Sequence, residues 1–104
     1  MEILEQLGLS NNEIKVYLAL LELEQSTATP IVKKADIPNS KIYPVLEKLI
    51  KKGLVNYVIK NNVKYFQASS PENLMDILNS KEKDIINQKK AVSKLIEEIE
   101  LKKK

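Results

Sequence analysis

The apolar residues of this chain recur with three different spacings, and each spacing predicts a different kind of element. Over residues 1–50 they return every three or four positions, which is typical of helices with one buried face. Residues 54–68 are rich in β-branched and aromatic side chains on either side of a turn at residues 60–62, which indicates a β-hairpin. Over residues 70–104 they return every seven positions, which is typical of a coiled coil.

The first 24 residues predict a short turn or helix that ends near Gly8, followed by a longer helix. Ser10 and Glu13 have the spacing of a capping box, so the longer helix is expected to begin there and to end near Glu24. The apolar residues of this longer helix form a broad stripe, and a broad stripe is expected on a helix that is buried on more than one side. Its expected members are Ile14, Val16, Tyr17, Leu18, Leu20, Leu21 and Leu23.

Residues 25–38 predict a short helix and a tight turn. Residues 25–26 interrupt the preceding periodicity, and Thr27 or Thr29 is expected to cap the helix that follows. Pro30 falls in its first turn, where a missing N–H costs least.

Residues 36–53 predict the turn and a third helix, so that residues 27–54 form a helix-turn-helix. Ile37 is expected to fill the core between the two helices, and Asn39 or Ser40 to cap the second one. Gly53 follows the last apolar position, where a left-handed cap is expected.

The last part of the chain predicts one helix of roughly 30 residues, about 45 Å long, because no Gly or Pro follows Pro71. Two heptad rows run along it, one wholly aliphatic and one aliphatic at its ends. Their aliphatic members are the expected dimerisation residues, Leu74, Leu78, Ile85, Val92, Leu95 and Ile99, and Lys81 and Gln88 lie between them. The alternatives are a helix that folds back on its own domain and two helices broken near residues 79–80.

A helix, a helix-turn-helix and a hairpin, in that order, form a winged helix. We therefore expect a mainly α fold with a small β-hairpin. A winged helix-turn-helix DNA-binding domain would occupy residues 1–69, and a C-terminal dimerisation helix, a coiled-coil helix, would occupy residues 70–104.

The composition excludes several classes of function. The chain has no Cys and no His, so disulfides, thiolate chemistry, the commonest general base and the commonest metal ligand are all missing. No phosphate loop, metal-ligand spacing or nucleophile–base pair is present. We expect no enzyme activity, no metal and no cofactor. No apolar run has the length of a membrane span, and no signal segment is present, so we expect a soluble cytoplasmic protein without a membrane partner.

The charge is concentrated in the middle of the chain. Residues 25–68 hold eight Lys and two acids, a net charge of +6, whereas residues 1–24 carry −4 and residues 69–104 carry +1. A basic module of this kind is the electrostatic footprint of a phosphate-binding surface. All seventeen cations are Lys, so bidentate recognition of guanine by Arg is excluded.

These segments resemble the DNA-binding domain of the TrmB family of archaeal transcriptional regulators. The resemblance covers about residues 3–80 and rests on Leu-Gly-Leu-Ser at 7–10, Ile-Pro-Asn-Ser-Lys-Ile-Tyr at 37–43, Lys-Gly-Leu-Val at 52–55 and Ser-Pro-Glu at 70–72. Many family members carry a C-terminal sugar-binding domain. The 104 residues leave no room for one, so we do not expect sugar sensing.

The candidate DNA contacts follow from how a helix-turn-helix docks. The start of its second helix meets base edges, its first helix crosses the phosphates, and the wing reaches a neighbouring groove. The candidates are Asn39, Ser40, Lys41, Tyr43, Lys48 and Lys51 on the second helix, Thr27, Thr29 and Lys33 on the first, and Lys60, Asn61, Asn62 and Lys64 on the wing. The alternatives are helix caps, a tyrosine packed on the wing, solvated lysines and an ordinary Asn-rich turn. Pro44 is expected to tighten or bend the recognition helix.

The expected function is a homodimeric, sequence-specific transcriptional regulator of the TrmB-like winged-helix type. It would bind double-stranded DNA at a palindrome and be associated with the nucleoid. The alternatives are a winged-helix protein-interaction or assembly module and a chromatin-like protein that binds DNA without sequence preference.

Overall fold

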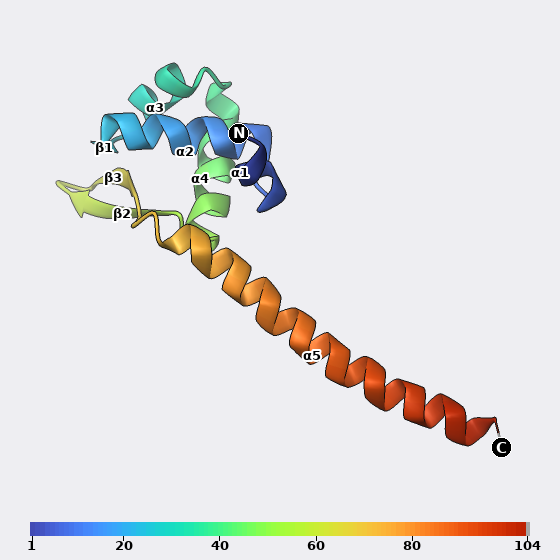
Figure 1. Cartoon of the computed structure of the whole chain (residues 1–104). Helices are drawn as coiled ribbons and strands as arrows, with labels where there is room; N and C mark the ends of the chain where they lie inside the picture. The colour runs from blue at the N-terminus through green and yellow to red at the C-terminus, as the bar shows by residue number, and fades with distance from the viewer. Residues whose placement is uncertain (104) are drawn as a thin grey trace. The chain divides into compact units, whose positions relative to one another are not determined.

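The computed structural model describes residues 1–103 and divides into two compact units, one ending at Leu74 and the other beginning at Met75 (Figure 1). The first unit contains α1 (Glu2–Gln6), α2 (Asn11–Leu23), β1 (Gln25–Ser26), α3 (Ala28–Ala35), the 3-10 turn η1 (Asn39–Lys41), α4 (Ile42–Lys51), β2 (Val55–Lys60) and β3 (Val63–Ala68). The last helix, α5 (Asn73–Lys102), begins at the end of this unit and makes up the second one. A mainly α fold with a small β element is confirmed.

Helix α2 lies between α3 and the sheet and contributes much of the core (Figure 1). Its capping box is confirmed, because the Ser10 hydroxyl accepts from the Glu13 amide and the Glu13 carboxylate accepts from the Ser10 amide, both at 3.2 Å. Val16 and Leu20 are fully buried, but Leu18 and Leu21 are 36% and 45% exposed, so that part of the predicted stripe is wrong. The periodicity indicated a face wider than the one that α3, α4 and β3 cover.

Helix α3 has Thr27 as its N-cap residue, as predicted, although the Thr27 hydroxyl makes no capping hydrogen bond. The turn after α3 depends on Asp36, which has a left-handed φ of 56° and donates its amide to the Val32 carbonyl at 2.9 Å. Ile37 follows it and is buried, as predicted.

The second helix of the helix-turn-helix begins differently from the prediction. Residues 39–41 form the single turn η1, and α4 begins only at Ile42, so neither Asn39 nor Ser40 caps it. Pro44 explains this start, because it has no N–H and its ring crowds the carbonyl four residues earlier, that of Ser40. Pro44 is therefore the third residue of α4, where an unpaired N–H is normal in any helix.

Gly53 ends α4 as predicted. It has a φ of +79°, and the amide of Leu54 reaches back to the Leu49 carbonyl at 3.0 Å, which is the pattern of a Schellman cap. An added Cβ would meet no atom within 4 Å, so the backbone conformation alone favours glycine at this position.

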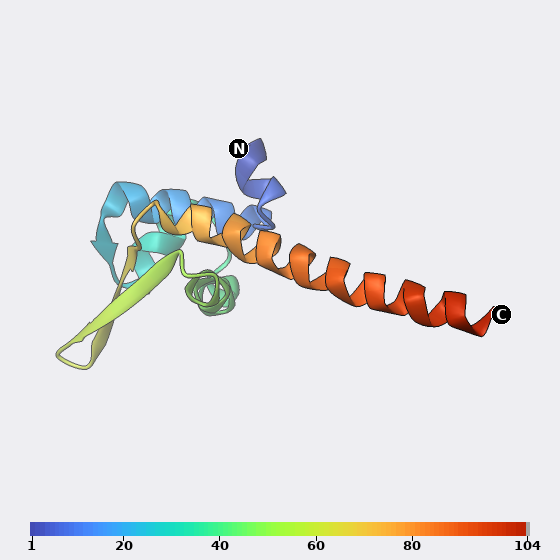
Figure 2. The same cartoon turned by 60° about the horizontal axis from the view of Figure 1, so that its bottom comes forward.

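The predicted hairpin is present, with a tighter turn. Lys60 pairs with Val63, so only Asn61 and Asn62 lie in the loop, and Lys60 belongs to β2 rather than to the turn. Both asparagines have positive φ, 51° and 64°, as a type I′ turn requires. Figure 2 shows the hairpin projecting past the helices of the first unit.

The sheet has a third strand that the sequence did not reveal. Residues 25–26 form β1, which pairs antiparallel with β3 and gives the strand order β1-β3-β2. The core of the unit lies between this sheet and the helices. Its fully buried side chains are Val16, Leu20, Ile31, Leu46, Leu49, Leu54 and Val55.

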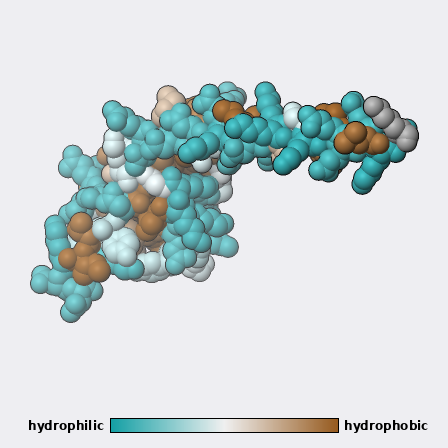
Figure 3. Space-filling model, turned by 90° about the horizontal axis from the view of Figure 1, so that it is seen from below, coloured by the Kyte–Doolittle hydropathy of each residue, from teal (hydrophilic) through white to brown (hydrophobic). Residues whose placement is uncertain are grey.

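Helix α5 is continuous over the predicted length, without a break at residues 79–80. It begins at Asn73, directly after Ser70-Pro71-Glu72. None of its described residues is buried. Figure 3 shows apolar patches along a largely hydrophilic helix surface. Among the residues the structure describes, no helix is long and apolar enough to span a membrane.

The expected dimerisation residues mostly face solvent. Leu78, Ile85, Val92, Leu95 and Ile99 are all exposed, whereas Leu74 is half-buried and belongs to the first unit.

Candidate nucleic-acid interface

The outward face of α4 is set by its buried face. Ile42, Val45, Leu46 and Leu49 all point into the core, with exposures of 7% or less. Helical periodicity then turns Tyr43, Glu47, Lys48 and Lys51 away from the core. Tyr43 is 60% exposed, so the side chain does not pack into the domain.

The turn η1 places Asn39, Ser40 and Lys41 directly before the N-terminal end of α4, and all three residues are exposed. Since neither Asn39 nor Ser40 caps α4, the alternative in which they act only as caps does not apply. Within residues 1–103 their side chains make no hydrogen bond, so amide and hydroxyl groups remain available to a ligand. We call the set Asn39, Ser40, Lys41, Tyr43, Lys48 and Lys51 the recognition surface.

The lysines of the helix-turn-helix fall into two groups. Lys34 pairs with Glu22 at 2.8 Å, and Lys52 pairs with Glu13 at 2.6 Å. No ion pair to a carboxylate of the described chain is made by Lys33, Lys41, Lys48 or Lys51. The uncompensated positive charge therefore lies on α3, η1 and the outer face of α4.

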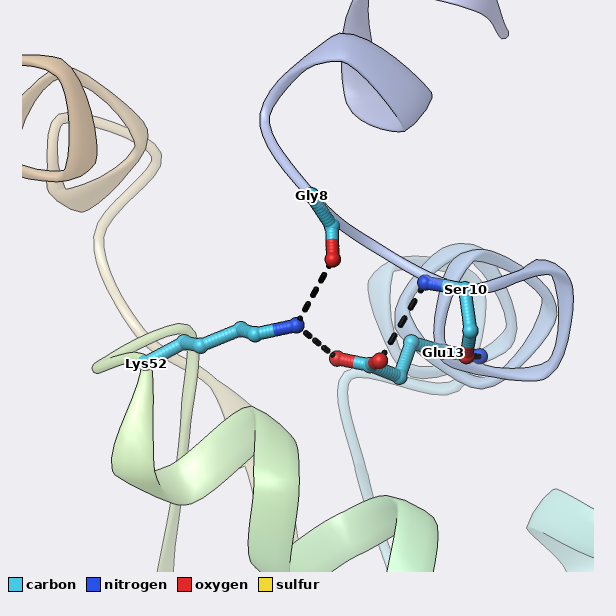
Figure 4. A network of polar contacts seen from close by, with 4 residues as sticks. All are labelled: Gly8, Ser10, Glu13 and Lys52. Carbon is cyan, nitrogen blue, oxygen red and sulfur yellow. Dashed lines mark hydrogen bonds and ion pairs between the residues drawn. The ribbon is translucent and has the colours of Figure 1, made fainter.

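The Lys52–Glu13 pair is part of a partly buried polar network that positions α4 (Figure 4). The Lys52 ammonium also donates to the Gly8 carbonyl at 3.0 Å, and the Glu13 carboxylate, only 4% exposed, accepts from the Ser10 amide. Burial acts to raise the pKa of Glu13, but the hydrogen bonds from Lys52 and Ser10 and the charge of Lys52 outweigh it and lower the pKa. The network fixes the end of α4 to the start of α2.

The candidates on α3 lie at its N-terminal end and along one face. Thr27 is half-buried, whereas Thr29 and Lys33 are exposed and, four residues apart, share a helix face.

The wing carries two lysines that lie against aromatic rings of the hairpin. The Lys60 ammonium lies 5.4 Å from the centre of the Tyr65 ring and donates to the Gln25 side chain at 3.1 Å. The Lys64 ammonium lies 4.6 Å from the centre of the Tyr57 ring. Both ammonium groups rest over aromatic rings, which limits their conformational freedom before any ligand binds.

A chain of amides that the sequence did not reveal continues from Lys60 across the outer face of the sheet. Gln25 donates to Gln67 at 2.9 Å, Gln67 donates to Asn56 at 2.7 Å, and Asn56 donates to Ser69 at 2.9 Å. Because all three strands contribute, the wing lysine is held by the whole sheet. The one part of this chain of amides that the sequence could have indicated is the Asn56–Gln67 contact, because the register of the hairpin places these two residues opposite each other.

The sequence profile described as "Sugar-specific transcriptional regulator TrmB" matches residues 4–72. The chain is 34% identical over 97 residues to the HTH-type sugar sensing transcriptional regulator TrmBL1 of Pyrococcus furiosus, covering 92% of this chain and 28% of that protein. It is 38% identical over 72 residues to the uncharacterized protein YrhO of Bacillus subtilis, covering 69% of this chain and 26% of that protein. The chain thus spans about a quarter of the length of these relatives.

Among solved structures, the fold is similar to that of TrmBL2, described as an archaeal chromatin protein with a novel mode of DNA binding. The TM-score is 0.84 at 22% sequence identity, over 94% of this chain and 39% of that chain. The family is one of transcriptional regulators and not of enzymes. The chain belongs to the TrmB family of transcriptional regulators.

Proposed function

We propose that this protein is a homodimeric, sequence-specific DNA-binding regulator of transcription. The observation that carries the proposal is the recognition surface, where exposed polar groups and uncompensated lysines share one side of a helix-turn-helix. Lys34 and Lys52 are neutralised by carboxylates, whereas the lysines of the recognition surface pair with no carboxylate of the described chain. Surfaces of this kind bind phosphates and base edges.

The recognition surface divides into two roles. Asn39 and Ser40, at the tip, read base edges in the major groove, with the Asn39 amide suited to adenine. Lys41, Lys48 and Lys51 neutralise phosphates and supply most of the affinity. Tyr43 donates its hydroxyl to the backbone or stacks on a sugar.

The neighbouring elements extend the contact. Thr29 and Lys33 meet phosphates at the start of α3, with Thr27 beside them. At the wing, Lys60, Asn61, Asn62 and Lys64 enter or flank the next groove. The sheet and the tyrosines hold the wing lysines in place, which lowers the entropy cost of binding.

Two copies act together in this proposal. The winged-helix domain at residues 1–69 binds DNA, and the helix at residues 70–104 pairs with a second copy through Leu74, Leu78, Ile85, Val92, Leu95 and Ile99. Exposed aliphatic residues at heptad spacing support this pairing. A regulator of this type would act in the cytoplasm, at the nucleoid.

The experiment is selection of duplexes from a random-sequence library, followed by affinity measurement on the selected and a scrambled duplex at two salt concentrations. We expect an inverted repeat to be enriched and the affinity to fall by about 10³–10⁵ between roughly 50 and 200 mM salt. If no duplex binds at the lower salt concentration, DNA binding is wrong and the protein-interaction module is favoured.

A second candidate function is DNA binding without sequence preference. It is favoured by the complete absence of Arg, which removes the commonest specific base contact. TrmBL2, which this chain resembles in fold, is described as a chromatin protein. If the selected and scrambled duplexes bind equally at both salt concentrations, this candidate replaces the sequence-specific regulator.

A further inference from the structure

We propose that the α5 helices of two copies pair in parallel and in register. The inference rests on the proposed homodimer and adds its orientation. In a heptad written a to g, each a position follows the preceding d position by four residues. Leu78 follows Leu74 by four, so Leu78, Ile85, Val92 and Ile99 occupy a, and Leu74, Lys81, Gln88 and Leu95 occupy d.

The core layers favour the parallel arrangement. In parallel and in register, every residue meets its own copy, so six of these eight layers are wholly aliphatic, one pairs two glutamines and one pairs two lysines. In the best-matched antiparallel arrangement, Leu78 meets Leu95, but Ile85 meets Gln88 and Val92 meets Lys81. Half of the layers would then set a polar side chain of one helix against an aliphatic side chain of the other, and burying a polar group against an apolar one is unfavourable.

The flanking charges point the same way. In a parallel pair, position g of one helix faces position e of the next heptad in the other. Asp84 at g then faces the partner's Lys89 at e, and Glu98 at g faces the partner's Lys103, the residue directly after the end of α5. Two copies would form four such pairs. The antiparallel arrangement sets Asp84 against Ala91 and forms only the two pairs between Glu82 and Lys89.

The aliphatic a residues fit this assignment, because β-branched residues at a with Leu at d favour two parallel strands. Ile85, Val92 and Ile99 are β-branched, and Leu74 and Leu95 stand at d. The parallel register brings the two Lys81 side chains close together, and their repulsion lowers the stability of the dimer. The acids at positions 82 and 84 offset part of this repulsion.

The orientation determines where the DNA-binding units lie. Because each unit joins α5 at its N-terminal end, parallel pairing brings both units to the same end of the dimer. An antiparallel pair would place them at opposite ends of a helix about 45 Å long. Parallel pairing therefore suits two half-sites about one helical turn apart, roughly 34 Å.

Single cysteines test the orientation, since the chain has none of its own. We expect Leu78→Cys alone and Leu95→Cys alone each to form a disulfide-linked dimer in a mildly oxidising glutathione buffer, read by non-reducing electrophoresis. A link that forms only when the two variants are mixed would show antiparallel pairing and overturn the proposal. A monomer by light scattering before oxidation would instead show that the homodimer itself is wrong.

A charge reversal gives an independent measure in the uncrosslinked protein. Asp84→Lys is expected to raise the dimer Kd about tenfold, and Asp84→Lys with Lys89→Glu to restore it. Glu97→Lys, the matched control at the outward f position, is expected to leave the Kd unchanged. If Asp84→Lys has no more effect than Glu97→Lys, Asp84 faces no cation and the parallel register is wrong.

Discussion

The Lys52 ammonium lies 2.6 Å from the Glu13 carboxylate and joins the C-terminal end of the recognition helix to the first turn of α2. This ion pair explains why Lys52 is not among the residues proposed to contact DNA, although Lys52 continues the basic run of α4. The same pair connects protonation to the position of α4, because Glu13 is almost fully buried.

Stability should fall in acid through this contact. The folded-state pKa of Glu13 lies below its ordinary value of 4.5, so its contribution is fully present above that pH and disappears as the pH falls through the folded-state pKa. Glu13→Gln is expected to cost about 2 kcal/mol at pH 7 and to make stability less dependent on pH below 4.5. Denaturant unfolding of both proteins at neutral and acid pH measures both effects.

Glu22→Gln is the matched control for this substitution. Glu22 also pairs with a lysine, Lys34, but both side chains are about half or more exposed. Removing this pair is expected to change stability by less than about 1 kcal/mol. Equal effects of the two substitutions would show that burial of the Glu13 pair contributes nothing.

Two lysines of the recognition surface should matter for DNA but not for folding. Lys41→Ala with Lys48→Ala removes exposed ammonium groups that pair with no carboxylate of the described chain, so the melting temperature should stay the same while affinity falls. The slope of log K against log salt should shrink by about 0.9 for each phosphate that the variant no longer neutralises. Lys15→Ala, an exposed lysine on α2, is the control and should change neither. Unchanged affinity in the double variant would remove α4 from the interface.

The wing turn permits a test that separates backbone from side chain. Asn62→Ala replaces a residue that tolerates the left-handed conformation with one that does not, and should destabilise the hairpin by about 1 kcal/mol. Asn61→Gly with Asn62→Gly keeps the turn but deletes both amides, so it should preserve the melting temperature and weaken DNA binding. If the glycine variant binds DNA as tightly as the original, the asparagines serve only the turn.

The sequence predicted elements whose signals are local. The capping box at Ser10 and Glu13, the Gly53 cap and the single long α5 all follow from residues within a few positions of one another. Strand β1 was missed because two residues have no periodicity, and its stability comes from pairing with residues 66–67, far along the chain. The same distance hid the Lys52–Glu13 pair and the amide chain on the sheet.

The recognition surface shows a similar division. Lys41, Lys48 and Lys51 face outward, as the helical periodicity indicates. Tyr43 is also exposed, which is consistent with the predicted contact to DNA. It did not predict η1, because the start of α4 depends on the missing N–H of Pro44 rather than on any capping side chain. That change frees Asn39 and Ser40 from a capping role.

The seam on α5 can be distinguished from mere exposure by comparing adjacent residues. Ile85 and Ile86 are equally exposed, at 51% and 52%, but only Ile85 occupies the heptad row that includes Val92. We expect Ile85→Asp with Val92→Asp to give a monomer by light scattering, because two buried charges would be set against their own copies. Ile86→Asp should remain dimeric. The monomer should keep its helix-turn-helix but bind an inverted repeat more weakly, since one unit then reaches only one half-site. Dimers in both proteins would show that a different surface joins the two copies.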